Sequence, residues 1–408
     1  MADLSVGIAG ISFKNPVWLA SGEPTSTFDK IKRGIDAGAG AVVAKSYCGA
    51  YLTGHEQKRP MPLAKFCILG YDRRPVYGKN IPKFYTNYCR SGIIQWCPYD
   101  EDEWIEELAK AQKYASKFDA LVIGSVFGSE DVNDMIRLAR KMEQAGLPML
   151  EVDLGCPNVE KMKEKGALLK TSQDYFDVAK EIVKGVSIPV FVKPSPQQAD
   201  LAATARGVKE VGAAGVTCQN RVLGLCIDIE NAKPYIWGWA GVGGPWMLPV
   251  SVGWVSQIYD TVPNFPILGS NGAYDWQDVV QFHMAGASAV EFCSTVMVKG
   301  YSVIRRAIRG LNDFLDAKGY GSVRDIIGIA TRASHNYEEM YSMPEYREKA
   351  SVDADKCVSC GKCLEVCWFG AMEKTDGTYR ANDTNCQGCY NCQVVCPVEG
   401  CITMRTVN

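Results

Sequence analysis

The stretch MLEVDLG, residues 149–155, is a short apolar run that ends in polar or small residues. Strands of a parallel sheet are buried on both faces, so a run of this kind is typical of such a strand. Seven other runs share these properties, and they are PVWLAS (from residue 16), AVVAKSY (41), ALVIGSV (120), PVFVKPS (189), GVTCQN (215), PILGSNG (266) and AVEFCST (289). The sequence therefore predicts eight buried strands.

Segments with helical periodicity alternate with these runs. They occupy residues 28–40, 102–118, 131–146, 174–185, 199–215, 276–286 and 301–319. Alternating strands and helices are typical of βα units around a parallel sheet. Eight strands between residues 16 and 295 favour a (β/α)8 TIM barrel over an open doubly wound sheet. No GxGxxG opens a helix after the first strand, so a nicotinamide-binding Rossmann domain is not predicted.

Two long insertions interrupt the pattern, at residues 47–99 after the second strand and at residues 221–246 after the sixth. Barrel enzymes build their active sites from the segments that follow the strands. We therefore expect both insertions to cover a pocket at that end of the barrel.

The composition bears on partners and on location. With 44 basic and 46 acidic residues the net charge is -2, and there is no basic run, so nucleic acid is not an expected partner. The first residues lack a signal-peptide pattern, and no apolar run reaches the length of a membrane span. Nine of the 17 cysteines follow Lys356, which does not resemble a secreted disulfide scaffold. We expect a cytoplasmic protein that has no membrane partner.

The C-terminal tail contains one cysteine spacing twice, in CVSCGKCLEVCW (residues 357–368) and CQGCYNCQVVCP (residues 386–397). This is the spacing of two-cluster ferredoxins, in which the fourth cysteine of each motif ligates the other motif's cluster. We predict one [4Fe-4S] cluster held by Cys357, Cys360, Cys363 and Cys396, and a second held by Cys386, Cys389, Cys392 and Cys367. A pair of zinc sites is the alternative, but zinc has no need of the third cysteine in each motif. Cys401 is left over as a packed thiol.

The tail also sets the expected domain boundaries. Residues 1–317 are predicted to form the barrel, residues 318–351 a helical linker and residues 352–408 a ferredoxin-type domain. A domain as small as the last one needs a metal to hold it together. Its clusters would carry single electrons, so the barrel should hold a group that accepts electrons singly and passes on a pair. Flavin is the natural candidate.

The segment EVDLGCPN, residues 151–158, places a thiol at the expected catalytic rim. Asp153 ends the strand, and Cys156 and Asn158 follow it. A thiol held there can donate a proton to a substrate, because the strand end sets its position and local charge tunes its pKa. The alternative is an inert buried cysteine.

Several motifs, taken in order, resemble the dihydroorotate dehydrogenase superfamily, and they are AVVAKSY, DLGCPN, FVKPSP, TCQN and GSNGAYDWQDVVQFHMAGASAVEFCST. The barrel with its double-cluster tail resembles in particular the ferredoxin-fused, pyrimidine-reducing part of dihydropyrimidine dehydrogenase. The resemblance covers nearly the whole chain. It implies an FMN that lies across the top of the barrel, and it implies that Cys156 is the general acid or base.

The resemblance also implies the residues of the site. Cofactor contacts are expected from Ala20, Ser21, Lys45, Gln95, Lys193, Asn220, Gly243, Gly244, Ser270, Asn271, Gly272, Ser294 and Thr295. The glycine-rich loops among these are the usual phosphate site of a barrel. Catalytic roles are expected for Cys156, Lys45, Asp153 and Asn158, and substrate contacts for Asn158, Asn220 and Arg221. Either lysine could instead be a solvated charge at the rim, since burial without an anionic partner is costly.

Four positions depart from the family's pattern. Asp153 replaces an asparagine, Asn158 stands where dihydropyrimidine dehydrogenase has histidine, Gln95 occupies another asparagine position and Arg221 replaces a threonine. The guanidinium of Arg221 could pair with Asp153, meet a substrate carboxylate or point to solvent. These changes leave room for a ring substrate other than uracil.

The resemblance implies an iron–sulfur flavoenzyme that reduces, or reversibly oxidises, an activated C=C bond of a cyclic, pyrimidine-like substrate. Electrons would pass through the two clusters to FMN, and Cys156 would be the proton donor. The electron partner would be a ferredoxin or an NAD(P)H-oxidising flavoprotein subunit, and the chain would form a homodimer or a higher oligomer. The alternatives are dihydroorotate-type oxidation, or an electron-transfer subunit whose barrel docks a partner flavoprotein.

Overall fold

The computed structural model describes residues 1–47, 65–69, 87–91, 97, 99–127, 131–155, 172–196, 200–235, 239–343 and 348–407. Within these ranges the chain forms two compact units, Met1–Arg332 and Ala333–Asn408. The division falls inside the segment 318–351 that we assigned to a linker. The predicted site residues Gln95, Cys156 and Asn158 lie outside the described residues.

The first unit is built around a closed barrel of eight strands. In barrel order these are β10 (Gly215–Cys218), β15 (Ile267–Gly269), β16 (Ala289–Phe292), β3 (Val17–Leu19), β4 (Ala41–Val43), β7 (Leu121–Phe127), β8 (Leu150–Asp153) and β9 (Val190–Lys193). Every neighbouring pair is parallel. Each strand overlaps one of the eight predicted runs, so the prediction of a TIM barrel is confirmed.

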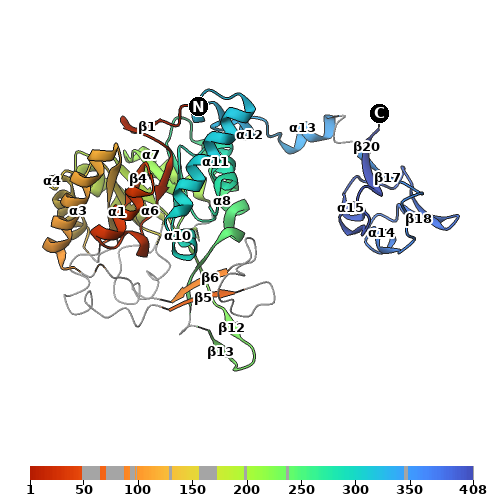
Figure 1. The fold of residues 1–408 in the computed structure, drawn as a ribbon, viewed down its shortest axis with the longest axis horizontal. Coiled ribbons are helices and arrows are strands. Elements are labelled where there is room, and N and C mark those ends of the chain that lie inside the picture. The colour runs from red at the N-terminus through yellow and green to blue at the C-terminus, as the bar shows by residue number, and fades with distance from the viewer. Residues whose placement is uncertain are drawn as a thin grey trace. The chain divides into compact units, whose positions relative to one another are not determined.

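Helices alternate with the barrel strands and surround them (Figure 1). They are α1 (Phe28–Asp36), α3 (Glu101–Ala115), α4 (Val132–Gln144), α6 (Ser172–Gly185), α7 (Leu201–Glu210), α8 (Leu248–Thr261), α9 (Trp276–Ala285), α10 (Ser294–Lys299), α11 (Ser302–Lys318) and α12 (Ile329–Arg332). The 3-10 helices are η1 (Glu23–Thr25), η4 (Ser116–Phe118), η5 (Pro245–Met247) and η6 (Val323–Ile326). Capping boxes begin α3 at Asp100 and α9 at Asp275, and each satisfies backbone N–H groups that a helix start leaves free.

The core of this unit is continuous from the barrel strands to the helices around them. Strand residues such as Val42, Val152 and Phe292 are completely buried, as expected for strands covered on both faces. Trp104 and Leu108 of α3 pack into the same core. A close-packed frame of this kind holds the side chains at the strand ends in fixed positions.

The two insertions contribute a second sheet of four strands, with the order β11 (Val222–Gly224), β14 (Ala240–Gly243), β6 (Asn87–Ser91) and β5 (Lys65–Leu69). All pairs in it are antiparallel, and β14 with β6 joins the two insertions. A hairpin of β12 (Ile227–Asp228) and β13 (Lys233–Pro234) extends the second insertion. Figure 1 shows β5, β6 and this hairpin projecting beyond the barrel. Another antiparallel pair, β1 (Val6–Ile8) and β2 (Ile11–Phe13), precedes the barrel.

The second unit is small and consists of short elements. They are α13 (Tyr337–Ser342), β17 (Glu348–Val352), α14 (Lys362–Glu365), β18 (Met372–Thr375), β19 (Thr378–Ala381), α15 (Asn391–Val395) and β20 (Ile402–Thr406). β17 pairs with β20, and β18 pairs with β19, both antiparallel. Nine buried residues form its core, and four of them are cysteines. So small an apolar core agrees with the expectation that bound metal holds this unit together.

Within the described ranges, no helix is both long enough and apolar enough to cross a bilayer.

Candidate active site and cluster cavities

A lysine and two glutamates meet inside the barrel, each from a different strand. Nζ of Lys193 on β9 lies 3.3 Å from Oε1 of Glu151 on β8 and 3.3 Å from Oε2 of Glu291 on β16. The three side chains are 7 %, 1 % and 0 % exposed. Oε2 of Glu151 also accepts a hydrogen bond of 2.9 Å from the hydroxyl of Thr217 on β10. Lys193 is therefore a buried cation with two carboxyl groups as partners, and the alternative of a solvated rim charge does not apply to it.

Burial and the neighbouring charges shift the pKa values of Lys193 and Glu291 in opposite directions. Burial opposes the charge of Lys193, but Glu151 and Glu291 outweigh it and raise the pKa of the ammonium above its usual value. Burial raises the pKa of Glu291, and Lys193 offsets this effect only in part. The sequence analysis did not identify the two glutamates. Each is a charged residue within an otherwise apolar predicted strand, MLEVDLG and AVEFCST, and this was the available signal.

Three predicted residues are linked by hydrogen bonds at the C-terminal ends of β8, β10 and β15. Nδ2 of Asn220 donates to Oδ1 of Asp153 at 2.8 Å, and the backbone N–H of Gly155 donates to the same oxygen at 3.0 Å. Nδ2 of Asn271 donates to the backbone oxygen of Asn220 at 3.1 Å. Burial raises the pKa of Asp153 despite the opposing charge of Lys193. Arg221, which also lies in the described part of the chain, forms no ion pair with Asp153.

Several charged residues of the rim act on the half-buried thiol of Cys293. Burial raises the pKa of Cys293 to about 11, Glu23 adds to the shift, and the nearby charges of Arg221, Lys45 and Lys193 oppose it. Lys45 itself lies 3.5 Å from Oε1 of Glu23, measured from Nζ. Because all these charges act on one thiol, the structure brings Lys45, Lys193 and Arg221 to one end of the barrel.

The predicted flavin contact Ser21 belongs to a chain of hydroxyl groups. Its Oγ lies 2.8 Å from Oγ of Ser46, which in turn lies 2.8 Å from Oγ of Ser125 on β7. Ala20, the other predicted contact in this segment, is buried and donates its N–H to the carbonyl of Phe292 on β16 at 3.0 Å. The segment that joins β3 to η1 is therefore held against two neighbouring strand ends, and Ser46 and Ser125 were not identified from the sequence.

The predicted phosphate loops contain backbone donors that have no acceptor among the described residues. These are the N–H groups of Gly244, Gly272, Ser294 and Thr295. A Cβ atom on Gly243 would lie 2.8 Å from Oδ1 of Asn271, so two of these loops are in close contact. The N–H of Ser270 is not one of these donors, because it donates to the carbonyl of Cys218 at 2.8 Å and continues the barrel hydrogen bonding. An anion here would be held by the other amides.

The substitution Gly272→Ala tests whether this loop binds the phosphate of FMN. Its φ is +130°, and a Cβ atom would lie 2.7 Å from the backbone nitrogen and the Cα of Leu248. We expect Gly272→Ala to destabilise the barrel by about 1–3 kcal/mol because the backbone must move. The affinity of the flavin-free protein for FMN should fall by about tenfold or more, in a fluorescence titration, since about 1.4 kcal/mol corresponds to tenfold.

Gly253 provides the matched control for this substitution. It lies within α8, and a Cβ atom there would meet nothing within 4 Å. We expect Gly253→Ala to stabilise the helix by about 0.5–1 kcal/mol and to leave FMN affinity unchanged. Equal FMN affinities for the two variants would contradict the assignment of the Gly272 loop to the phosphate.

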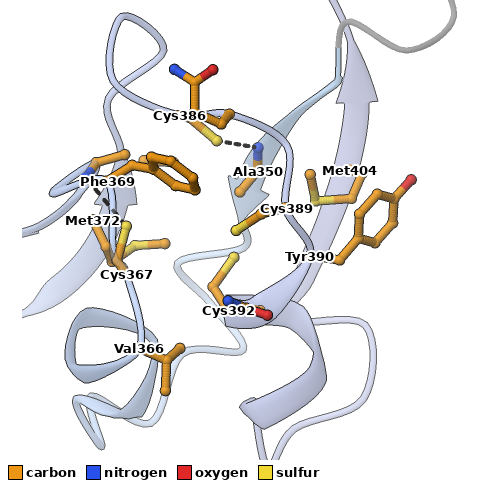
Figure 2. Close-up of a pocket in the computed structure, with 14 residues that line it drawn as sticks. Ala350, Val366, Cys367, Phe369, Met372, Cys386, Cys389, Tyr390, Cys392 and Met404 are labelled. Carbon is orange, nitrogen blue, oxygen red and sulfur yellow. Dashed lines mark hydrogen bonds between the residues drawn. The ribbon is translucent and has the colours of Figure 1, made fainter. Parts of the chain in front are cut away.

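Two cavities in the second unit are each lined by one predicted set of cysteine ligands. A cavity of about 350 Å³ is lined by Cys367, Cys386, Cys389 and Cys392, and Figure 2 shows their sulfur atoms around one space. A cavity of about 300 Å³ is lined by Cys357, Cys360, Cys363 and Cys396. The fold thus brings together the fourth cysteine of each motif with the first three of the other.

Backbone N–H groups donate to two of these sulfur atoms. The backbone N–H of Ala350 donates to Sγ of Cys386 at 3.4 Å, and that of Ala371 donates to Sγ of Cys367 at 3.2 Å. Hydrogen bonds of this kind stabilise cluster thiolates. Among the described residues no three His, Cys, Asp or Glu side chains converge on one point as a zinc ion requires. Cys401 is buried and also lines the smaller cavity.

The barrel end fits a polar, phosphate-bearing cofactor. Oε1 of Gln219 and Oε1 of Glu291 are buried there without a hydrogen-bond partner in the described part of the chain. Four backbone N–H groups in the loops beside them have no acceptor within the described ranges, and Lys193 carries a buried positive charge. A TIM barrel with such an end, followed by a two-cluster unit, defines an iron–sulfur flavoprotein. A protein with these two kinds of redox group is an oxidoreductase.

Comparison with known proteins agrees with this class. The family described as dihydroorotate dehydrogenase matches residues 100–315, and a 4Fe-4S dicluster domain matches residues 350–404. The dihydroorotate dehydrogenase B (NAD(+)) catalytic subunit of Methanocaldococcus jannaschii is 31% identical over 329 residues, which are 80% of this chain and 98% of that protein. The NAD-dependent dihydropyrimidine dehydrogenase subunit PreA of Escherichia coli K12 is 26% identical over 422 residues, which are 99% of this chain and 96% of PreA.

The chain belongs to the dihydroorotate dehydrogenase family. Proteins of this family bind FMN, and the C-terminal domain is of the kind that binds two [4Fe-4S] clusters. The predicted cofactors and the predicted family are therefore confirmed.

Proposed function

We propose that this enzyme reduces, or reversibly oxidises, an activated C=C bond of a pyrimidine-like ring. The full-length similarity to PreA carries this proposal, because it covers both the barrel and the cluster domain, whereas the dihydroorotate dehydrogenase B relative matches 80% of the chain. When bound, FMN supplies hydride transfer to or from carbon and exchanges single electrons with the clusters.

The residues at this end of the barrel would bind the cofactor, contact the substrate and transfer the proton. The free amides of Gly244, Gly272, Ser294 and Thr295 would hold the phosphate. Lys193 would place a positive charge near the flavin ring or its ribityl oxygens, and Lys45 would contribute a second at the rim. Asn220, which Asp153 orients at 2.8 Å, would contact the substrate. Cys156 follows β8 and would exchange the proton with the ring carbon.

The altered residues of the site leave room for a ring substrate other than uracil. Three positions depart from the pattern of the pyrimidine-reducing family that this sequence resembles, and they are Asp153, Asn158 and Arg221. A Cβ atom on Gly241 would lie 2.9 Å from Cζ of Arg221, so this guanidinium packs against β14 of the second sheet. Since it does not pair with Asp153, it is available to a carboxylate or a carbonyl of the substrate.

We also propose the electron partner and the assembly. The similar proteins are named as subunits of NAD-dependent enzymes, and this sequence has no GxGxxG after its first strand. Electrons would therefore come from a separate NAD(P)H-oxidising flavoprotein subunit or from a ferredoxin, and would pass through the clusters to the barrel. The chain would act in the cytoplasm, as a homodimer or a higher oligomer, since a reducing compartment suits its many free cysteines.

The experiment that tests the function starts with anaerobic purification and analysis of iron, sulfide and flavin. We expect about eight irons and one FMN per chain, as two [4Fe-4S] clusters require. The reduced protein is then mixed with uracil, thymine, orotate and a panel of cyclic enones, and reoxidation of the flavin is followed by absorbance.

Reoxidation by uracil or thymine supports pyrimidine reduction. Reoxidation by orotate, together with reduction of the oxidised protein by dihydroorotate, would favour the alternative of dihydroorotate-type chemistry, which the 31% identity to a dihydroorotate dehydrogenase B subunit supports. A full complement of clusters without FMN would reject both and favour an electron-transfer subunit.

A further inference from the structure

The buried group of Lys193, Glu151 and Glu291 contains two acids for one base. Nζ of Lys193 lies 3.3 Å and 3.4 Å from the two carboxylate oxygens of Glu151, and 3.3 Å from Oε2 of Glu291. If all three side chains were ionised, one negative charge would be unbalanced in a dry environment. A neutral carboxylic acid is much less costly to bury than an unbalanced carboxylate. The group therefore requires one additional proton.

The contacts indicate which acid holds that proton. Both oxygens of Glu151 face Lys193, and Oε2 of Glu151 also accepts from Thr217 at 2.9 Å. Glu291 presents only Oε2 to Lys193, and its Oε1 has no partner within the described residues. Glu151 accepts three close contacts from two donors, Lys193 and Thr217, whereas Glu291 accepts one close contact from Lys193 and the influence of the Ser270 side chain. Glu151 is therefore the better anion, and Glu291 is the better place for the proton.

The other groups around Glu291 agree with this placement. Glu151 on β8 adds a like charge, and Lys193 on β9 and the hydroxyl of Ser270 after β15 favour ionisation. Its neighbour in the strand register on β3 is Trp18, which is apolar and completely buried. Asp153 is a further acid that acts on Lys193. Burial is the largest influence, and it raises the pKa of Glu291.

We propose that Glu291 is a positioning residue that carries the one exchangeable proton beneath the FMN site, and that it thereby keeps the charge of Lys193 available to the cofactor. This inference rests on the proposed function, because Lys193 is one of the expected FMN contacts. With Glu291 protonated, Lys193 and Glu151 balance each other. With Glu291 ionised, the group is negative and opposes the entry of electrons into the site.

As a consequence, reduction at alkaline pH is coupled to the uptake of one proton by Glu291. When Glu291 is ionised, the entry of two electrons from the reductant is accompanied by transfer of one proton from water to a carboxylate oxygen of Glu291. One O–H bond forms on the protein, and one hydroxide remains in solution. Below the pKa of Glu291 the proton is already present, and reduction proceeds without this uptake.

The first measurement is the midpoint potential of the bound FMN against pH, by stepwise reduction of the full-length holoenzyme with dithionite. Above the pKa of Glu291 in the oxidised protein, the potential should fall with pH by an additional 30 mV or so per pH unit, since one proton then accompanies two electrons (about 29.6 mV per tenfold). Glu291→Gln has nearly the same shape and no proton to exchange, so this additional slope should be lost. An unchanged slope in Glu291→Gln would overturn the proposal.

The second measurement is the infrared pH-difference spectrum of the full-length, flavin-free protein. A band from a buried, protonated carboxyl group should be present at neutral pH, disappear at alkaline pH and be absent from Glu291→Gln. It should also be absent from Glu151→Gln, because Glu291 then becomes the sole partner of Lys193 and ionises. Asp153→Asn serves as the control and should retain the band. A band that persists in Glu291→Gln and disappears in Glu151→Gln would assign the proton to Glu151 and reject the proposal.

The two measurements separate this inference from the proposed function. If the protein does not bind FMN, the proposed function fails, and the infrared spectrum still decides where the proton lies. If FMN binds and the infrared band is missing from the native protein, the proposed function stands and the role of Glu291 is wrong.

Discussion

Replacing Lys193 with methionine should lower the free energy of unfolding of the barrel by about 3–5 kcal/mol at neutral pH, because a buried carboxylate then loses the cation that balances it. Glu151 and Glu291 lie 3.3 Å from Nζ of Lys193 and are almost completely buried. Neither can reach solvent without opening the barrel. The measurement is urea denaturation of the full chain, followed at the transition of the barrel unit.

Three comparisons make this prediction specific. Lys32→Met removes a lysine from an exposed pair with Asp36, at 2.6 Å, and should change stability by at most about 1 kcal/mol. The double variant Lys193→Met with Glu151→Gln should recover most of the loss, because it removes the buried pair as a whole. The deficit of Lys193→Met should also shrink as the pH is lowered from 7 towards 5, since protonation removes the unbalanced carboxylate.

The outcomes distinguish a buried ion pair from a packing contribution. If Lys193→Met loses as little stability as Lys32→Met, the buried cation does not stabilise the barrel and the interpretation is wrong. If the double variant is no more stable than Lys193→Met alone, the loss comes from the missing lysine stem and not from its charge.

Replacing Cys156 with alanine should lower the rate of substrate reduction by about 10²–10⁴-fold, the usual contribution of a general acid. The segment DLGCPN places this thiol three residues after Asp153, which ends β8. FMN and cluster content should be unchanged, because alanine removes only the proton donor. The measurement is the single-turnover reoxidation of the reduced protein by the substrate found in the functional test.

Cys226→Ala is the matched control, since it removes a thiol of the second insertion between β11 and β12. Its reoxidation rate should equal that of the native protein. A serine at position 156 should retain a small part of the rate, because a hydroxyl is a much weaker acid than a thiol. Native turnover in Cys156→Ala would reject the assigned role.

Much of the fold could be predicted because its signals are local. Each barrel strand overlaps a predicted apolar run, and the two cysteine motifs predicted the two ligand sets that now line separate cavities. The second sheet was not predicted. Its strands β14 and β6 belong to different insertions, and pairing between segments so far apart leaves no periodic signal in either one.

The active site was predicted only in part, for a similar reason. Motifs in single segments indicated Lys193, Asp153 and Asn220, and the structure brings these residues to one end of the barrel. Glu151 and Glu291 were not predicted, because they lie within apolar strands. The N–H of Ser270, which begins a predicted phosphate loop, continues the barrel hydrogen bonding to Cys218.

The barrel, the two-cluster domain and the family follow from the sequence by itself, because apolar periodicity and cysteine spacing depend on neighbours along the chain. The contacts of the site depend on tertiary structure alone. Lys193 meets Glu151 across 42 residues and Glu291 across 98, and only closure of the barrel brings these strands together. The two glutamates then keep the lysine charged against the effect of burial. Burial requires that one acid hold a proton, since the cost of an unbalanced charge arises only where water is excluded.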